Sequence, residues 1–435
     1  MLTEMGNYEL KTSGNELSTA FENLPREKWN KLIDELFIDF PNGSQDGVLT
    51  TYFLRSTYPK IGGQILRHID RDSHFWGLLL PRRDPDGNNW TLRTYLSGSD
   101  THFQEKHQTA IQTFLYSSGV NPVFWYDTRS KRDEKFVGKV LARFGDFGIS
   151  FPDIDQAKEA ENLQKRIWNV TDPAYLYPFD LYHPDAGMAT RLVAIQRDEV
   201  IGFLFGFYGR GNQWTGTREE DCIWIESQLM GVEPKHRREG VAKRLKLTQR
   251  QLALEDGIKL IRWTVDPLQA GNAFLNLNEL GGIAMHFYPD YYPFRNDLNR
   301  VRASRIAISW FLESERVQER ITGGKKILNF KDFKLDSSTE IVIPVDDSGS
   351  SIRQFDYSNW KPQGSNLLVH IPSNWNELQR TNVNVAVIWR EATDALWGKI
   401  LGTKDDNYGL VGMVENSENN DVFVVAQRFP AKIVR

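Results

Sequence analysis

The chain has 435 residues, of which 40% are hydrophobic and 25% charged, and its formal net charge at pH 7 is -4. This length predicts two or three units with separate hydrophobic cores. The weakly negative charge provides no general attraction to nucleic acid or to an anionic membrane surface, so cations that bind phosphate must act locally. We therefore expect a globular protein without nucleic-acid or membrane partners.

The cysteine content and the lengths of the apolar runs indicate in which cellular compartment the protein is expected. Cys222 is the only cysteine, which excludes an intramolecular disulfide framework, and no Cys/His cluster indicates zinc. The first residues lack the pattern of a signal peptide. The longest apolar stretches, such as residues 200–209, are far shorter than the ~20 residues of a membrane-spanning helix. These features predict a cytoplasmic protein without a metal.

The N-terminal part, residues 1–150, predicts an α/β domain. Its hydrophobic patterns indicate, in chain order, helices at 16–37 and 47–57, strands at 62–69, 73–83 and 90–99, a helix at 101–119, a strand at 121–127 and a helix at 133–145.

The middle part, residues 151–313, predicts a mixed α/β sheet. The expected elements are a helix at 153–167, strands at 190–196, 199–209 and 221–232, a helix from Val241 to about Glu255, a strand at 258–266, a helix at 268–280 and strands at 283–289 and 302–311. The first two strands are separated by Arg197 and Asp198 only, which is the spacing of a hairpin.

The C-terminal part, residues 314–435, predicts a linker and a small α+β extension. Polar, turn-rich segments are followed by a strand, a long helix and a hairpin.

Two short segments of the chain resemble each other, because GDFGISFPD at 145–153 echoes GGIAMHFYPD at 281–290. The echo favours a tandem duplication of one α/β fold, with chance similarity of two short segments as the alternative.

Residues 236–245, HRREGVAKRL, lie between a predicted strand and a predicted helix. The first backbone N–H groups of a helix have no partner within the helix, and together with the helix dipole they bind phosphate readily. Gly240 and Ala242 would let a ligand approach the backbone, and Arg237 and Arg238 would add charge-assisted hydrogen bonds. The alternative is a glycine at a helix entry surrounded by solvated cations.

This stretch resembles the pyrophosphate loop of the GNAT superfamily of acyl-CoA-dependent N-acyltransferases. The family pattern [QR]-x-x-G-x-[GA] after V-x-P is matched by Val232, Pro234, Arg237, Gly240 and Ala242. The resemblance covers about residues 150–313. The chain also resembles a subgroup of large predicted GNAT proteins, through DPLQAGNAFLNLNELG at 266–281 and VAVIWREATDALW at 385–397.

The resemblance implies a GNAT fold, with the N-terminal domain as a degenerate GNAT-like copy. It also implies acetyl-CoA or another acyl-CoA as co-substrate and a primary amine, small or amino-acid-like, as acceptor. The implied binding residues for the acyl-CoA are Met230, Val232, Arg237, Arg238, Gly240, Val241, Ala242, Lys243, Asn272 and Asn276. The first two would pair their backbone with the pantetheine arm, like an added strand, and polarise the thioester carbonyl.

Amine acylation also needs a base, because a lysine-like amine titrates near ~10.4. Glu226 matches the position of the base glutamate of many superfamily members. It lies four residues before Met230, so ordinary alternation predicts one face for both side chains, unless a bulge shifts the phase. A glutamate on an exposed strand face is the alternative.

The superfamily's usual acid is a tyrosine in the helix after the fifth strand, but Leu277 stands at that position. Tyr288 and Tyr291 are candidates to protonate the leaving thiolate, because a phenol is neutral at pH 7. Packing aromatics are the alternative for both.

The sequence therefore predicts a direct-transfer acyl-CoA N-acyltransferase. The rival interpretations are a GNAT-like protein that binds CoA and senses it without turnover, an acyl-CoA enzyme of another reaction type such as a decarboxylase, and a non-enzymatic interaction protein. The sequence leaves the acceptor, the acyl chain length and a homo-oligomeric state open.

Overall fold

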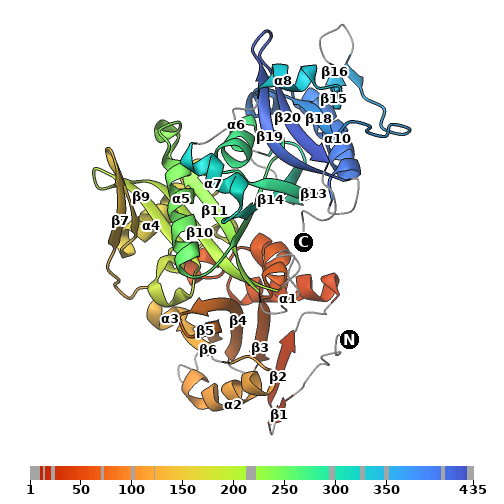
Figure 1. Cartoon of the computed structure of the whole chain (residues 1–435). Helices are drawn as coiled ribbons and strands as arrows, with labels where there is room; N and C mark the ends of the chain where they lie inside the picture. The colour runs from red at the N-terminus through yellow and green to blue at the C-terminus, as the bar shows by residue number, and fades with distance from the viewer. Residues whose placement is uncertain are drawn as a thin grey trace. The chain divides into compact units, whose positions relative to one another are not determined.

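The computed structural model describes residues 10–12, 15–20, 25–69, 73–98, 103–121, 123–211, 222–292, 299–323, 329–346, 352–402 and 407–428. The chain divides into two compact units, which we call the first unit (Met1–Ile258) and the second unit (Lys259–Arg435). Both units combine helices with mixed sheets, so the predicted α/β class is confirmed (Figure 1).

The first unit begins with a six-stranded sheet in the order β1 to β6. Its strands are β1 (Leu10–Thr12), β2 (Asn15–Ala20), β3 (Gln64–Ile69), β4 (Ser73–Asp84), β5 (Gly87–Gly98) and β6 (Val123–Asp127). The helices of this part are α1 (Arg26–Asp39), α2 (Phe103–Ser117) and the short α3 (Thr128–Lys131). Phe114 of α2 packs with Leu79 and Leu92 in one apolar core.

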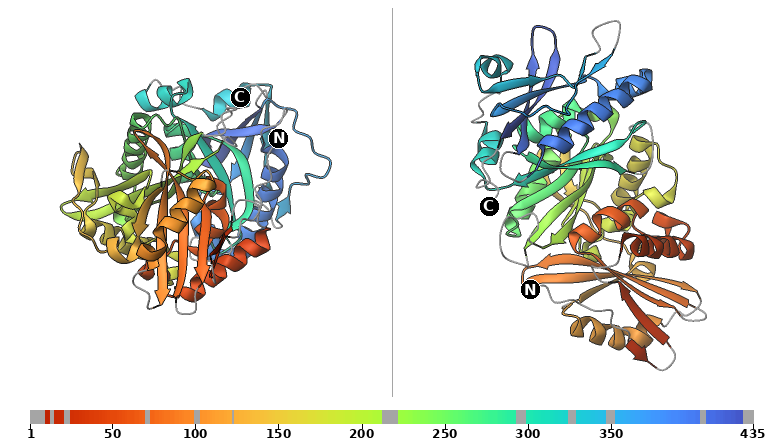
Figure 2. Two further views of the ribbon diagram at one scale, coloured as in Figure 1. Left: turned by 90° about the horizontal axis from the view of Figure 1, so that it is seen from below. Right: turned by 90° about the vertical axis from the view of Figure 1, so that its right-hand side faces the viewer.

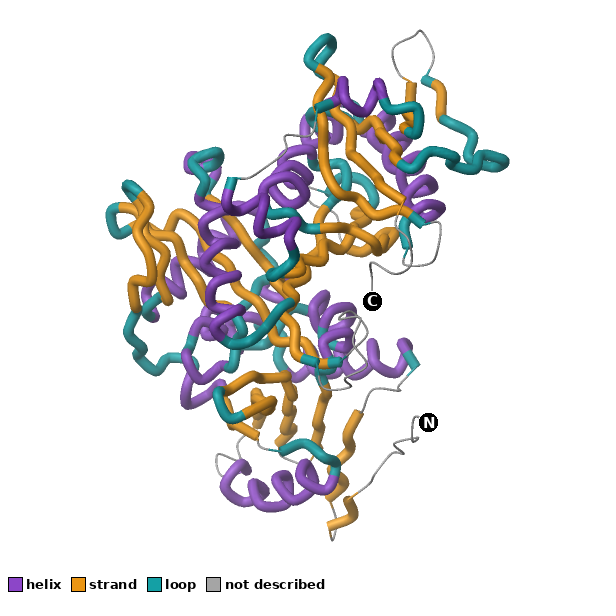
Figure 3. The backbone as a smooth tube through the Cα atoms, viewed as in Figure 1, coloured by secondary structure: helices purple, strands orange, loops and turns teal. Residues whose placement is uncertain are grey.

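The rest of the first unit contributes five strands in the order β11-β10-β9-β8-β7, all antiparallel to their neighbours. They are β7 (Lys139–Phe144), β8 (Phe147–Phe151), β9 (Thr190–Gln196), β10 (Glu199–Arg210) and β11 (Ile223–Val232). Two helices belong to this layer, α4 (Ile154–Trp168) and α5 (Val241–Glu255). Figure 3 shows α5 following β11 after a short loop. Val241 and Leu245 of α5 pack on Leu204 of β10.

The second unit contains strands in the order β15-β18-β20-β19-β13-β14-β12. They are β12 (Leu260–Val265), β13 (Ile283–Tyr292), β14 (Ala303–Phe311), β15 (Thr339–Val342), β18 (Asn366–Ile371), β19 (Tyr408–Asn416) and β20 (Asp421–Arg428). A separate two-stranded sheet joins β16 (Val345–Asp346) to β17 (Arg353–Gln354).

The helices of the second unit are α6 (Ala270–Ala273), α7 (Glu315–Thr322), α8 (Phe330–Leu335), α9 (Trp375–Thr381) and α10 (Val383–Ile400). Trp389 of α10 contacts the ring of His370 on β18 at 5.4 Å between centroids. Figure 2 shows α10 as the long blue helix beside the strands of this unit. The predicted strand, helix and hairpin of the C-terminal extension are confirmed.

Several sequence predictions about local structure are wrong. Residues 15–20 form β2 instead of a helix, and residues 139–144 form β7 instead of a helix. In β7 the pairing with β8 satisfies the backbone groups of one edge, and this tertiary ladder outweighs the helical propensity of the segment. The helix expected at 268–280 divides into α6 and a π-helical turn, Phe274–Glu279.

The order of strands and helices repeats along the chain. The series β3, β4, β5, α2, β6 in the N-terminal part has the same order of element types as β9, β10, β11, α5, β12. The predicted duplication is consistent with this order. It stays a prediction, as do the two boundaries, after residues 150 and 313, between the three predicted domains.

Candidate functional site

The loop between β11 and α5 is built from a short 3-10 turn, Pro234–His236, and two residues with left-handed backbones. Arg238 has φ +69° and Gly240 has φ +82°. A glycine adopts such a backbone without strain, which explains Gly240 immediately before the helix. A Cβ added to Gly240 would meet no atom within 4 Å, so the space in front of the helix start is open.

The two helix starts of this layer differ in how their N–H groups are satisfied. Asp153 caps α4 with a complete capping box, in which its side chain accepts from the Gln156 N–H and the Gln156 side chain accepts from the Asp153 N–H. Gly240 caps α5 without any side-chain hydrogen bond. The first N–H of α5 that bonds within the helix is that of Arg244, to Gly240 O at 3.0 Å. The start of α5 therefore presents N–H groups suited to an external anion.

Cations surround this start. Arg237 and Arg238 are exposed, and Lys243 is half-buried in the first turn of α5. Nearby charges of both signs are paired, since His236 Nδ1 lies 3.0 Å from Glu239 Oε2 and Lys235 Nζ lies 3.2 Å from Glu199 Oε2. All loop residues predicted from the sequence, Arg237, Arg238, Gly240, Val241, Ala242 and Lys243, thus lie at one helix start.

The edge of β11 that faces away from β10 carries the backbone groups of Met230 and Val232. The N–H of Glu233 donates to Ile201 O of β10 at 2.9 Å. Alternate residues of an antiparallel strand direct their N–H and C=O to the same neighbour, so Met230 and Val232 direct theirs to the opposite edge. Consistent with this, Val232 O accepts a hydrogen bond of 3.4 Å from Arg237 Nε.

A β-bulge interrupts β11 between Glu226 and Met230. Glu226 pairs with Phe207 of β10, whereas Leu229 pairs with Phe205, so β11 carries one extra residue. Glu226 and Leu229 therefore share a face, and Met230 lies on the other face with the core under α5. The expectation that Glu226 and Met230 share a face is wrong, because the bulge shifts the alternation.

The bulge also sets the direction of the backbone. Before it, the N–H of Gly211 donates to Cys222 O at 2.9 Å, so even-numbered residues of β11 point toward β10. Unbroken alternation would point the N–H of Met230 at β10 as well. The extra residue reverses this phase and turns the backbone groups of Met230 and Val232 away from β10.

The two predicted asparagines of the second unit differ in environment. Asn272 is exposed on α6. Asn276 is only 4% exposed, and its Oδ1 has no hydrogen-bond partner among the residues that the structure describes. Such a buried acceptor is a better candidate for ligand contact than a surface asparagine. Neighbouring Asn278 is structural, because its amide bonds both Met413 N and Met413 O of β19, at 2.7 and 2.8 Å.

The predicted proton donors lie together at the end of β13. The rings of Tyr288 and Tyr291 are 5.5 Å apart, and Tyr292 packs edge-on against Tyr291 at 5.3 Å. Leu277, at the position of the usual acid, is completely buried and has no proton to donate. Burial lowers the pKa of nearby His286 to about 4, with Arg262 adding to the effect, so His286 is neutral at pH 7.

Sequence reasoning missed Lys246 of α5. This lysine is 2% exposed, and its Nζ donates to Ser227 Oγ of β11 at 2.7 Å and to Gln249 Oε1 at 3.3 Å. Burial lowers its pKa well below the usual value, although the charge of Glu226 opposes that shift. A lysine beside an amphipathic stripe normally indicates a solvated helix face, so the sequence carries no signal of this burial.

A cavity of about 650 Å³ in the first unit lies beside the same loop, at the start of α4 and the turn between β9 and β10. Five carboxylates and only two cations, Arg166 and Lys235, line it, so its charge is net negative; the carboxylates are Asp155, Glu159, Asp198, Glu199 and Glu233. This lining repels a phosphate, so the cavity is not the anion site at α5.

Within the described ranges, no helix is long and apolar enough to cross a membrane. In the same ranges, no cluster of three or more His, Cys, Asp or Glu side chains is placed to hold a metal ion.

A family model for acetyltransferases of the GNAT family matches residues 154–275. This range contains α4, the bulged strand β11, the glycine loop and α5. Residues 154–275 belong to the GNAT acetyltransferase family. The match covers less than half of the chain, and the N-terminal part lies outside it. No curated protein sequence matches the chain.

Solved structures that align with part of the chain include Ard1 from Thermoplasma volcanium, which is 17% identical and aligns over 38% of this chain and 96% of its own, with a TM-score of 0.29. The structure of yncA from Salmonella typhimurium, solved with its cofactor acetyl-CoA, is 16% identical and aligns over 39% of this chain and 96% of its own, with a TM-score of 0.31. The ribosomal-protein-S18-alanine N-acetyltransferase from Escherichia coli is 13% identical and aligns over 39% of this chain and 95% of its own, with a TM-score of 0.30. Likenesses of this extent support no inference about substrate.

Proposed function

We propose that the GNAT domain transfers an acyl group from acetyl-CoA, or another acyl-CoA, directly to a primary amine. The observation that carries the proposal is the start of α5, which lacks a side-chain cap, lies in open space and is flanked by Arg237 and Arg238. A diphosphate would accept hydrogen bonds from the N–H groups of Val241 and Ala242 and from the guanidinium groups.

The outward backbone of β11 extends this site along the donor. Met230 and Val232 would pair with the pantetheine arm as an added strand would. The Met230 N–H would donate to the thioester oxygen and stabilise the negative charge that develops there during attack. Asn276 would contribute its buried Oδ1, and Asn272 its exposed amide, as further contacts to the donor.

The proton transfers require two groups. Glu226 would accept the proton of the attacking amine, through a water, as the amine nitrogen forms its bond to the thioester carbon. When the C–S bond breaks, Tyr288 or Tyr291 would donate a proton to the thiolate of CoA. The acceptor would be a small or amino-acid-like amine, and the reaction would have no covalent enzyme intermediate.

Isothermal titration with CoA and acetyl-CoA tests the donor site. Ala242→Glu places a carboxylate in the first turn of α5, where it suits the helix dipole and preserves folding but repels a diphosphate. We expect the affinity to fall about 10- to 100-fold, equivalent to one or two charge-assisted hydrogen bonds. Gln251→Glu adds the same charge to the exposed end of α5 and should bind as the wild type does. Equal affinity of the Ala242→Glu variant would refute the anion site.

Release of free thiol from acetyl-CoA with a panel of primary amines tests the reaction. We expect turnover with at least one amine, and a kcat about 100-fold lower for Glu226→Gln with an unchanged KM for acetyl-CoA. Full turnover by Glu226→Gln across the pH range would exclude Glu226 as the base.

A CoA-binding sensor is the second candidate, favoured by the fully buried Leu277 at the place of the usual acid. A sensor would bind acetyl-CoA in the titration and release no thiol with any amine. An acyl-CoA enzyme of another type, such as a decarboxylase, would consume its thioester substrate without an amine.

A further inference from the structure

The bulge of β11 is held by side chains on both faces of the strand. On the face under α5, Ser227 Oγ accepts from Lys246 Nζ at 2.7 Å and donates to Gln249 Oε1 at 3.0 Å. On the other face, Gln228 Nε2 donates to Tyr177 Oη at 2.8 Å. The two consecutive residues of the bulge are therefore fixed in opposite directions.

The strand opposite the bulge is adapted to it. Gly206 of β10 faces the extra residue, and a Cβ added there would lie 2.8 Å from Glu226 O and 3.3 Å from the Cα of Ser227. Such a contact with backbone is too short to be accommodated, so a residue larger than glycine would push the bulge away. The irregular pairing is thus a built feature of the sheet.

The polar contacts under the bulge form a buried chain. Beyond Ser227 and Lys246, Gln249 Nε2 donates to Thr190 Oγ1 of β9 at 2.9 Å. All four side chains are at least nine-tenths buried. Burying polar groups, and a lysine above all, is costly even when hydrogen bonds form, and an apolar side chain of similar length would fill the same space at lower cost. Packing alone therefore does not explain a lysine at position 246.

We propose that Lys246 is a positioning residue of the acyl-transfer site, which holds the β11 bulge so that the backbone groups of Met230 and Val232 point away from β10. The inference rests on the proposed function for its consequence in catalysis. The bulge reverses the backbone phase between Glu226 and Met230, and Ser227, the residue that Lys246 binds, lies inside it. In this role Lys246 acts through its hydrogen bond to Ser227.

The test compares wild type with Lys246→Met, which keeps the length of the side chain and removes the hydrogen bonds. Lys158→Met, on the exposed face of α4, is the matched control. The first readout is amide hydrogen exchange of residues 226–232 in the free protein. We expect exchange at least tenfold faster in Lys246→Met and unchanged in Lys158→Met.

The second readout is turnover of acetyl-CoA with whichever amine of the panel releases thiol fastest. In Lys246→Met we expect kcat to fall at least tenfold, the KM for acetyl-CoA to change less than threefold and the melting temperature to stay equal or rise. A lysine with a merely structural role would lower the melting temperature and leave kcat unchanged.

Ser227→Ala removes the same hydrogen bond from the side of its acceptor. If Lys246 acts through Ser227, the kcat of the double variant should equal that of Lys246→Met rather than the product of the two losses. Exchange and kcat both within twofold of wild type in Lys246→Met would overturn the proposal. If the wild-type protein neither binds nor turns over acetyl-CoA, the proposed function fails, while the exchange rates still decide whether Lys246 holds the bulge.

Discussion

Two buried basic side chains, Lys246 in the first unit and Arg390 in the second, are stabilised in different ways. Lys246 of α5 donates to the uncharged oxygens of Ser227 and Gln249. Arg390 of α10 is 1% exposed, and its Nη2 donates to the carboxylate of Asp266 at 2.7 Å. A buried charge with a direct counter-charge is compensated in place, whereas burial lowers the pKa of Lys246 well below its usual value although the charge of Glu226 opposes that shift. The ion pair of Arg390 with Asp266 stabilises the fold. A buried lysine with a lowered pKa, such as Lys246, is more typical of a functional site.

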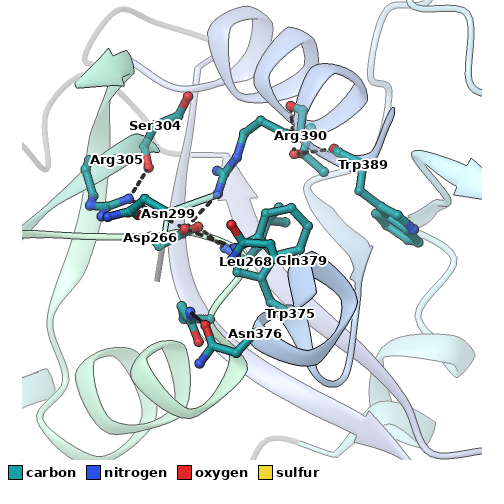
Figure 4. A network of polar contacts seen from close by, with 12 residues as sticks. Asp266, Leu268, Asn299, Ser304, Arg305, Trp375, Asn376, Gln379, Trp389 and Arg390 are labelled. Carbon is teal, nitrogen blue, oxygen red and sulfur yellow. Dashed lines mark hydrogen bonds and ion pairs between the residues drawn. The ribbon is translucent and has the colours of Figure 1, made fainter. Parts of the chain in front are cut away.

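Asp266 is the centre of the network in the second unit (Figure 4). Its Oδ1 accepts from the Leu268 N–H at 2.9 Å, and its Oδ2 accepts from Trp375 Nε1 at 3.2 Å besides Arg390. The guanidinium of Arg390 also lies over the Trp375 ring, 4.9 Å from its centroid. The DPL segment and the WRE segment, far apart in the sequence, are thus direct partners in the fold.

The largest effect is expected from Arg390→Met. Removing Arg390 takes away the direct counter-charge of buried Asp266 and leaves Arg305 Nη1, at 3.5 Å, as a more distant cationic neighbour, so the free energy of unfolding should fall by about 3 kcal/mol in urea denaturation. Arg380→Met, on the exposed side of α9, is the control and should change stability by less than about 0.5 kcal/mol. Adding Asp266→Asn to Arg390→Met should restore part of the loss. A loss below about 1 kcal/mol for Arg390→Met would remove the contrast with Lys246.

A pH series should separate Lys246 from ordinary lysines. Its folded pKa lies well below the unfolded value, so between the two pKa values the unfolded chain binds more protons and stability rises with pH. Relative to Lys246→Met, the wild-type free energy of unfolding should rise with pH below the unfolded pKa of ~10.4, by at most about 1.4 kcal/mol per pH unit. Parallel curves for the two proteins would show that Lys246 titrates normally.

The smallest effect concerns Asp394, whose Oδ1 lies 3.9 Å from Arg390 Nη1. Burial raises the pKa of Asp394 to about 6, despite a hydrogen bond from Ser304 and the charge of Arg390. The folded state then holds the proton more tightly, so this stabilising contribution is present at low pH and is lost as pH rises through about 6. From pH 4 to 6.5, wild type should lose up to about 2 kcal/mol relative to Asp394→Asn, after allowance for partial exposure. Thermal melts of both proteins across this range measure the difference, and a constant difference would contradict it.

The sequence by itself predicted the features that depend on local rules. Arg197 and Asp198, at φ +48° and +67°, form the two-residue turn expected between β9 and β10. The apolar stripe and the glycines at 240 and 257 predicted the bounds of α5, Val241–Glu255. The phosphate loop was readable because its glycine, its cations and the helix start are neighbours in the chain. Hydrogen bonds and charges within a few residues are set before any distant segment packs.

Tertiary structure decided the features that depend on distant partners. Residues 139–144 form a strand because β8 offers a pairing ladder, and Lys246 is buried because Ser227 and Gln249 receive its hydrogen bonds. The bulge in β11 requires Gly206 on another strand, so alternation along β11 alone predicted the wrong face for Met230 relative to Glu226. Register and burial are properties of pairs of segments, and a single segment does not contain them. The chain thus specifies its anion site locally, whereas the direction of the backbone beside that site depends on the assembled sheet.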